Sequence, residues 1–156
     1  MKIITPGSYD PITLGHLDII RRAAEKYEEV YAVIFINPEK KYRFSTEDRL
    51  EMLKLATSDI PNVICDSYDG YVVDYMKKHG IEKIVKGYRN SKDLEYEKVQ
   101  AEYNFLHGGY ETELLLSDEK YGKISSSEVR SRLSEKEDFE ELVPSKVFEY
   151  IKGSCF

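Results

Sequence analysis

The chain of 156 residues has only two cysteines, Cys65 and Cys155, which stand far apart in the sequence. Two isolated thiols supply neither the clustered ligands of a zinc site nor the framework of a disulfide-stapled domain. We therefore expect no metal bound by a protein cluster of its own. Unpaired thiols are typical of a reducing compartment, and we expect a cytoplasmic protein.

Long hydrophobic runs are also absent. No stretch reaches the roughly 18 apolar residues of a membrane-spanning helix. The N-terminal sequence MKIITPGSYD lacks the extended apolar segment of a secretory signal. Repeats, low-complexity tracts and interdomain linkers are missing as well, so we expect one domain over residues 1–156 and no membrane partner.

The chain has no excess of positive charge. It carries 23 Lys and Arg against 29 Asp and Glu, a formal net charge of −6. Non-specific binding to DNA or RNA depends on a basic surface, so the sequence argues against a nucleic-acid partner. A small anionic ligand remains open, because a few well-placed cations can hold phosphate inside an acidic protein.

What the sequence does contain is a regular alternation of short apolar runs and amphipathic segments. Apolar and β-branched runs predict strands at about 2–5, 30–35, 62–66, 81–87 and 111–117. Helical spacing and capping residues predict helices at about 14–27, 45–57, 71–80, 92–106, 125–133 and 144–152. This order favours an α/β fold, a single-domain Rossmann-like doubly wound parallel sheet with helices on both faces.

Such a sheet binds ligands beyond the carboxyl ends of its strands. The segment GSYDPITLGH (7–16) runs from a strand through a loop into a helix, so its backbone N–H groups can hold an anion. It matches neither GxGxxG nor GxxxxGK[ST], which disfavours a dinucleotide fingerprint and a P-loop. A single histidine at a helix start is more often a cap, but among the cations described next we interpret His16 as a phosphate ligand.

Further polar groups follow other predicted strands. Lys40 and Lys41 come after one strand, and Lys86 and Arg89 after another, so together they suggest a polyphosphate clamp. The run Ser125–Ser127 precedes a helix, where it can cap the helix or present hydroxyl groups to a phosphate. The two interpretations are compatible, because one serine can cap while another faces a ligand.

These residues resemble a known family. Thr13-Leu14-Gly15-His16 is similar to the first signature of the nucleotidyltransferase superfamily with the T/HxGH motif, and ISSSEVR (124–130) resembles its second. KGYRNSKDLEYE (86–97) is similar to the RGxRxxxDFEYE stretch that distinguishes the pantetheine-phosphate adenylyltransferase family. The three motifs keep that family's order and spacing, so the resemblance covers nearly the whole chain.

The resemblance implies transfer of the adenylyl group of ATP to 4′-phosphopantetheine, the penultimate step of coenzyme A synthesis. Mg²⁺ would accompany ATP, coenzyme A would be a feedback ligand, and the chain would form a homohexamer. Catalysis would fall to His16, Lys40 and Arg89, with Ser8, Lys40, Val72, Lys86 and Asn104 binding phosphopantetheine. ATP would be bound by Ser8, Tyr9, His16, Gly87, Tyr88, Arg89, Glu97, Tyr121, Gly122, Lys123, Ile124, Ser125, Ser126 and Ser127.

The chain departs from the family pattern at several positions. Lys86 stands where the family usually has arginine, Tyr88 where it has leucine, and Tyr103 where it has methionine. Gly122 and Lys123 replace a small polar residue and an aromatic one.

Three other functions share some of these features. Nicotinate-mononucleotide adenylyltransferases and cytidylyltransferases have the first motif but lack the stretch seen here at residues 93–97. A nucleotide sensor without chemistry needs only backbone N–H groups, and the pair His16 and Lys40 argues against it.

Overall fold

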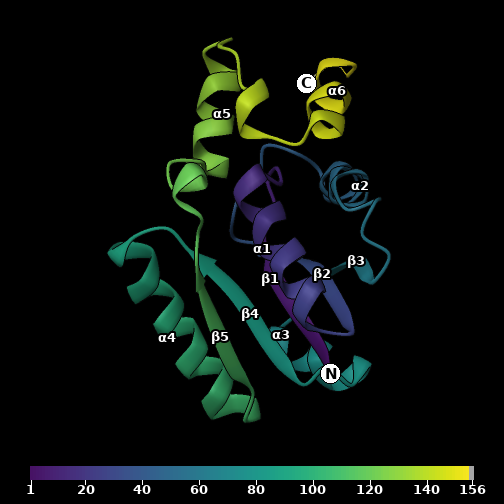
Figure 1. Cartoon of the computed structure of the whole chain (residues 1–156), viewed down its shortest axis with the longest axis vertical. Coiled ribbons are helices and arrows are strands. Elements are labelled where there is room, and N and C mark those ends of the chain that lie inside the picture. Colours follow the sequence, from purple (N-terminus) through teal and green to yellow (C-terminus); the bar gives the residue numbers. More distant parts are fainter. Residues whose placement is uncertain (155–156) are drawn as a thin grey trace.

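The computed structural model describes residues 1–154, in which strands and helices alternate along the chain (Figure 1). The strands are β1 (Lys2–Gly7), β2 (Glu29–Phe35), β3 (Val63–Tyr68), β4 (Lys83–Tyr88) and β5 (Glu111–Leu116). The α-helices are α1 (Leu14–Lys26), α2 (Thr46–Ala56), α3 (Val72–His79), α4 (Ser91–Gly108), α5 (Ser126–Ser134) and α6 (Ser145–Lys152). Short 3₁₀ turns, which the sequence did not indicate, lie at Glu119–Tyr121 and Glu140–Leu142.

The five strands form one parallel sheet in the order β3-β2-β1-β4-β5. The chain winds outward from β1 in both directions, so the strand order reverses between β1 and β4. This arrangement confirms the predicted doubly wound α/β sheet. It also places the ligand-binding crevice expected of such a fold beyond the carboxyl ends of β1 and β4.

β1 and β4 stay together for only a short distance. They pair at Ile3 with Lys83 and at Ile4 with Ile84, whereas β1 continues to pair with β2 as far as Gly7. The sequence predicted that this first strand ends at about residue 5, and the structure corrects this, because Pro6 and Gly7 remain in register with β2. Pro6 has no N–H to donate across the gap to β4. The two strands therefore part where the crevice begins.

Helices cover both faces of the sheet, as Figure 1 shows for α1 in front of the strands and α3 behind them. Alternating strand residues separate two cores. Ile3 belongs to the core shared with α1, α2, α5 and α6, whereas Ile4 faces the core containing Tyr75 and Met76 of α3. α4 packs beside α3 and against β4 and β5, and none of its residues is buried.

Within residues 1–154 no helix has the length and apolar character that a membrane crossing requires. Cys65 is a free thiol within hydrogen-bond distance (3.2 Å) of the Thr57 hydroxyl, and Cys155 lies outside the described residues.

Candidate functional site

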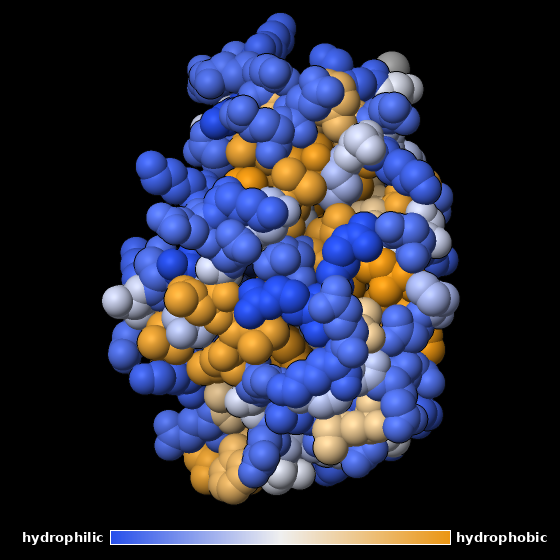
Figure 2. Space-filling model, in the orientation of Figure 1, coloured by the Kyte–Doolittle hydropathy of each residue, from blue (hydrophilic) through white to orange (hydrophobic). Residues whose placement is uncertain are grey.

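A cavity of about 620 Å³ lies where β1 and β4 part. Residues from the ends of both strands line it, together with the start of α1, the start of α4 and the start of α5. A second cavity of about 450 Å³ adjoins it and extends along α4 toward α3. The two cavities share a wall that includes Ser8, Lys40, Lys86 and Glu97. In Figure 2, strongly hydrophilic side chains cross the middle of the face shown, with hydrophobic areas on both sides of them.

The first loop reaches the cavity with free backbone donors. Ser8 and Tyr9 both line it, and their N–H groups donate to no other group of residues 1–154. Tyr9 has a positive φ of 46°, which turns the chain sharply after β1. Its phenol donates to the carbonyl of Thr5 (2.9 Å), so the loop folds back on its own strand. This geometry supports the predicted anion-binding loop.

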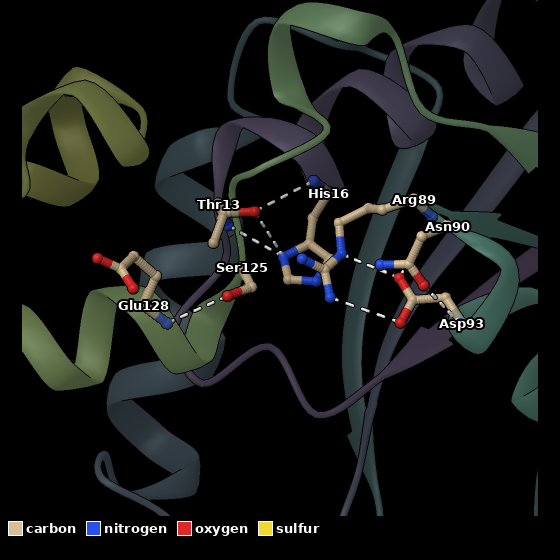
Figure 3. A network of polar contacts seen from close by, with 7 residues as sticks. All are labelled: Thr13, His16, Arg89, Asn90, Asp93, Ser125 and Glu128. Atoms are coloured by element: carbon tan, nitrogen blue, oxygen red, sulfur yellow. Dashed lines mark hydrogen bonds and ion pairs between the residues drawn. The ribbon is translucent and has the colours of Figure 1, made fainter.

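His16 caps α1 and lines the cavity at the same time. Its Nδ1 accepts the backbone N–H of Thr13 (3.1 Å), while the Thr13 hydroxyl accepts the N–H of His16 (3.3 Å). Figure 3 shows this reciprocal cap, with the imidazole close to the Arg89 side chain. Because Nδ1 is an acceptor, the neutral ring carries its proton on Nε2. The two interpretations of His16, a helix cap and a ligand-binding residue, are therefore compatible.

The ring also stays neutral over a wide pH range. Burial, with a smaller contribution from the positive charges of Lys86 and Arg89, lowers the pKa of His16 from 6.5 to about 4. Between these two values the unfolded chain binds a proton that the folded chain does not bind. Protonation of His16 therefore destabilises the fold progressively as the pH falls from 6.5 to about 4.

Two cations, one within β4 and one directly after it, are paired with carboxylates of α4. Lys86 Nζ lies 3.4 Å from Glu97 and donates to the carbonyl of Pro6 (3.2 Å). Arg89 donates through Nε to Asp93 (3.0 Å), as Figure 3 shows. Glu97 is largely buried, and burial raises the pKa of its carboxyl against the opposing effect of Lys86. These pairs hold both cations at the cavity.

Lys40 is held more loosely. It lies in the loop between β2 and α2, lines both cavities and forms no ion pair within residues 1–154. Its Nζ lies 5.6 Å from the centre of the Tyr42 ring. The charge of Lys40 therefore remains available at the boundary between the cavities.

Asp10 connects three segments around the cavity. Its buried carboxylate accepts the backbone N–H groups of Arg43 (2.9 Å) and Phe44 (3.0 Å), just after the Lys40 loop. Its carbonyl accepts Arg130 Nη1 of α5 (2.9 Å). Neither Asp10 nor Arg130 was among the site residues predicted from the sequence. Arg130 follows Ser127 by three residues, a helical spacing that could have indicated it.

The three serines at the start of α5 each make a different hydrogen bond. Ser125 caps α5 by accepting the N–H of Glu128 (3.1 Å; Figure 3). Ser126 donates to the carbonyl of Pro11 (2.8 Å), which joins α5 to the first loop. The hydroxyl of Ser127 accepts Arg130 Nη2 (3.1 Å), and all three serines line the cavity. The predicted combination of capping and ligand contact is consistent with this geometry.

Most of the predicted site residues come together. The first cavity is lined by Ser8, Tyr9, His16, Lys40, Lys86, Gly87, Arg89, Glu97, Ile124, Ser125, Ser126 and Ser127. The second cavity is lined by Val72 and Asn104, in addition to the shared wall. Gly87 has a further packing role, because a Cβ at this position would lie 2.6 Å from Ile19 of α1.

Four residues predicted to bind ATP line neither cavity: Tyr88, Tyr121, Gly122 and Lys123. The carbonyl of Tyr88 accepts the N–H of Ser117 (2.9 Å), an extension of the β4–β5 pairing. Tyr121 lies beside Gly15 instead, and the 3₁₀ turn at Glu119–Tyr121 leaves Lys123 exposed. Their predicted contacts with ATP stay predictions.

Comparison with known proteins identifies the family. The model of the cytidylyltransferase-like family matches residues 4–132. A phosphopantetheine adenylyltransferase of Corynebacterium efficiens is 42% identical over 97% of this chain and 96% of its own. One of Symbiobacterium thermophilum is 46% identical over 92% of this chain and 90% of its own. The chain belongs to the cytidylyltransferase-like family and, within it, to the phosphopantetheine adenylyltransferases. A relative of that name in Clostridium novyi is 42% identical over 95% of this chain and 92% of its own.

The resemblance inferred from the three motifs is thereby confirmed. The family model ends at residue 132, so it includes both signatures and the stretch at residues 86–97. His16, Arg89 and Ser125, one residue from each motif, meet at the same cavity.

The hydrogen bond accepted by Nδ1 predicts the charge and the tautomer of His16 in solution. At about pH 5.5 an ordinary histidine is largely charged, whereas we expect the His16 ring to be neutral with its proton on Nε2. Nitrogen chemical shifts of the imidazole, measured by NMR across a pH titration, report both properties. The signal is assigned by its loss in His16→Gln. A His16 ring that titrates near its ordinary pKa would contradict the structure.

Proposed function

We propose that this chain transfers the adenylyl group of ATP to 4′-phosphopantetheine, giving dephospho-coenzyme A and pyrophosphate. The observation that carries the proposal is the pair of adjoining cavities with a shared cationic wall. A transfer between two substrates needs two sites that meet at the reacting phosphates. The name of the relatives gives the same reaction, and their similarity extends over nearly the whole chain.

The chemistry requires little of the protein beyond positioning and charge. A phosphate oxygen of phosphopantetheine attacks the α-phosphorus of ATP in line, and the bond from that phosphorus to the bridging oxygen of pyrophosphate breaks. The attacking phosphate is already an anion, so no general base and no covalent intermediate are needed. Stabilisation of the charge that develops on the α-phosphate carries the catalysis.

In this proposal each side chain of the site contacts a particular part of a substrate. His16 donates from Nε2 to a non-bridging oxygen of the α-phosphate, which a neutral ring with Nδ1 already occupied is prepared to do. Lys40 bridges the two substrates from the shared wall, and Arg89 binds the phosphates of ATP. Lys86 and Ser8 bind the phosphate of phosphopantetheine. The arm of that substrate lies along Val72 and Asn104 in the second cavity.

Mg²⁺ enters the proposal with the triphosphate. The three carboxylates that line the first cavity, those of Asp10, Asp93 and Glu97, are engaged with backbone N–H groups, Arg89 and Lys86. Mg²⁺ keeps several waters and is commonly bound through substrate phosphates with one or two carboxylates, which suits such a site. When bound, the ion neutralises charge on the phosphates of ATP.

The remaining parts of the proposal concern assembly and regulation. α4 has no buried residue in the single chain and exposes Val99, Phe105 and Leu106, and Leu116 is exposed on the edge strand β5. Hydrophobic side chains on this side of the molecule are visible in Figure 2. They support subunit contacts, and the family resemblance favours a homohexamer in the cytoplasm. Coenzyme A shares its pantetheine arm and its adenosine with the product, so we propose it as a feedback ligand.

The proposed reaction is tested by pyrophosphate release. We expect release from MgATP with 4′-phosphopantetheine, and none above background with nicotinate mononucleotide or glycerol 3-phosphate. CTP in place of ATP is the control for the nucleotide. Release with either control acceptor, or with CTP in preference to ATP, would contradict the proposed function. ATP binding without release from any acceptor would favour a nucleotide sensor.

The role of His16 as a hydrogen-bond donor is tested with variants that separate this role from its part in the helix cap. Loss of a donor to a transition state typically lowers turnover by about 10²–10³-fold, which we expect for His16→Ala. The variant His16→Gln provides a new acceptor for the N–H of Thr13, as glutamine does in a capping box. We expect His16→Gln to restore the melting temperature but not kcat. A folded His16→Ala variant that retains more than about a third of the turnover would exclude the role.

Lys86 is tested against a lysine on the same strand. Loss of one charged hydrogen bond costs about 1.5–3 kcal/mol, so Lys86→Ala should raise the KM for phosphopantetheine about tenfold or more. Lys83 is a close match, because its side chain is 26% exposed against 27% for Lys86 and also pairs with a glutamate. Lys83 lines neither cavity, and Lys83→Ala should leave this KM unchanged. Equal effects of the two changes would exclude a phosphate contact by Lys86.

A further inference from the structure

Arg49 is a buried cation whose charge is only partly compensated within residues 1–154. It lies in the first half of α2, and only 1% of its surface is exposed. Within residues 1–154 no carboxylate forms an ion pair with it, and its Nε has no hydrogen-bond partner. Buried charges in proteins are almost always paired, because removing a charge from water is costly. The buried carboxylate of Asp10 attracts the guanidinium from beyond ion-pair distance and raises the pKa of Arg49, but burial has the larger effect and lowers it. A buried guanidinium without a direct ion pair therefore needs an explanation.

Its contacts lead to the phosphate-binding loops. Nη1 donates to the carbonyl of Ser8 (2.9 Å), in the loop that lines both cavities. The guanidinium stacks on the ring of Tyr42, 3.9 Å from its centre, and Tyr42 accepts the N–H of Asn37 (2.9 Å). Asn37 and Tyr42 lie on either side of Lys40 in the chain. Arg49 thus supports the Ser8 loop and the Lys40 loop from behind.

The hydrogen bond from Arg49 to the Ser8 carbonyl also fixes the direction of the next backbone N–H, that of Tyr9. A peptide unit is planar and trans, so its C=O and the following N–H point in opposite directions. Because the carbonyl of Ser8 faces Arg49, the N–H of Tyr9 points away from Arg49. That N–H is one of the free donors of the loop, and Tyr9 lines the first cavity. Arg49 itself lines neither cavity, so it acts through the residues that it holds.

We propose that Arg49 is a positioning residue for the phosphate of the acceptor substrate. It orients the Ser8–Tyr9 peptide, supports the Lys40 loop and contributes a buried positive charge that is neutralised when a phosphate binds on the other side of the loop. The proposal deepens the function proposed above and depends on phosphopantetheine as the acceptor.

Three variants and one control separate positioning from simple stability. Arg49→Met keeps most of the side-chain volume and removes the charge and the hydrogen bonds. Arg49→Lys keeps the charge and one donor for Ser8. Thr46→Val removes the hydroxyl that accepts Arg49 Nη2 (3.1 Å) and leaves the bond to Ser8 in place. The control, Arg21→Gln, changes an exposed helical arginine that pairs with Asp59 (3.0 Å) and lines neither cavity.

Binding is measured by calorimetry with 4′-phosphopantetheine and with pantetheine, which lacks the phosphate. Loss of a charged interaction should weaken binding of the phosphorylated ligand about tenfold or more in Arg49→Met, while pantetheine binding changes less than about twofold. Arg49→Lys should recover part of this loss, and Thr46→Val and Arg21→Gln should bind both ligands as the unaltered chain does. In kinetics, the KM for phosphopantetheine should rise more than the KM for ATP.

A merely structural role predicts a different pattern. A lower melting temperature with equal losses for the two ligands, or with equal increases in the two KM values, would overturn the proposal. Unchanged binding in Arg49→Met would overturn it as well. If the unaltered chain does not bind phosphopantetheine, the proposed function fails and this proposal fails with it. Binding by the unaltered chain together with equal losses in Arg49→Met overturns the positioning role alone.

Discussion

The site depends on the early separation of β1 from β4. The two strands pair only through Ile3 and Ile4, although each continues for several residues in register with its outer neighbour. Pro6 lies just past the last paired residue, and its carbonyl is bonded to the side chain of Lys86 instead of to a backbone N–H. A side chain of β4 thus replaces a ladder hydrogen bond. The space that opens is the cavity in which the three motifs meet.

Local capping chemistry then decides what the cavity can do. A histidine at the third position of a helix can satisfy the cap and leave its second nitrogen free, and His16 does so. The backbone thereby selects the tautomer, and burial, with a smaller contribution from the charges of Lys86 and Arg89, keeps the ring neutral. The donor that the proposed reaction requires is therefore prepared before any substrate arrives. Asp10 also lines the cavity and binds backbone at the same time, because its carboxylate accepts two N–H groups just after the Lys40 loop.

The fold could be predicted from the sequence because periodicity and caps determine it locally. Asn90, Ser125 and Gly109 lie at the helix ends that their residue types favour. The parallel direction of the strands follows from the alternation of strands and helices. The predicted site rested partly on residues that follow strands and partly on the family resemblance, and most of these residues do converge. Arg49 and Asp10 could not be found in this way. Their importance arises from contacts between segments distant in the chain, which carry no local pattern.

The distribution of ion pairs explains how an acidic chain can treat its two proposed substrates differently. Arg89, on the side assigned to ATP, is already paired with Asp93, so an incoming phosphate must compete with that carboxylate. Lys40 and Arg49, beside the Ser8 loop, form no direct ion pair within residues 1–154, although the carboxylate of Asp10 attracts Arg49 at longer range. ATP would arrive with part of its charge neutralised by Mg²⁺ and needs less from the protein. The phosphate of the acceptor brings no cation of its own, and Lys86, which is proposed to bind it, is itself paired with Glu97 (3.4 Å). Lys40 at the boundary between the cavities and Arg49 behind the Ser8 loop would therefore supply the positive charge that no direct ion pair already compensates.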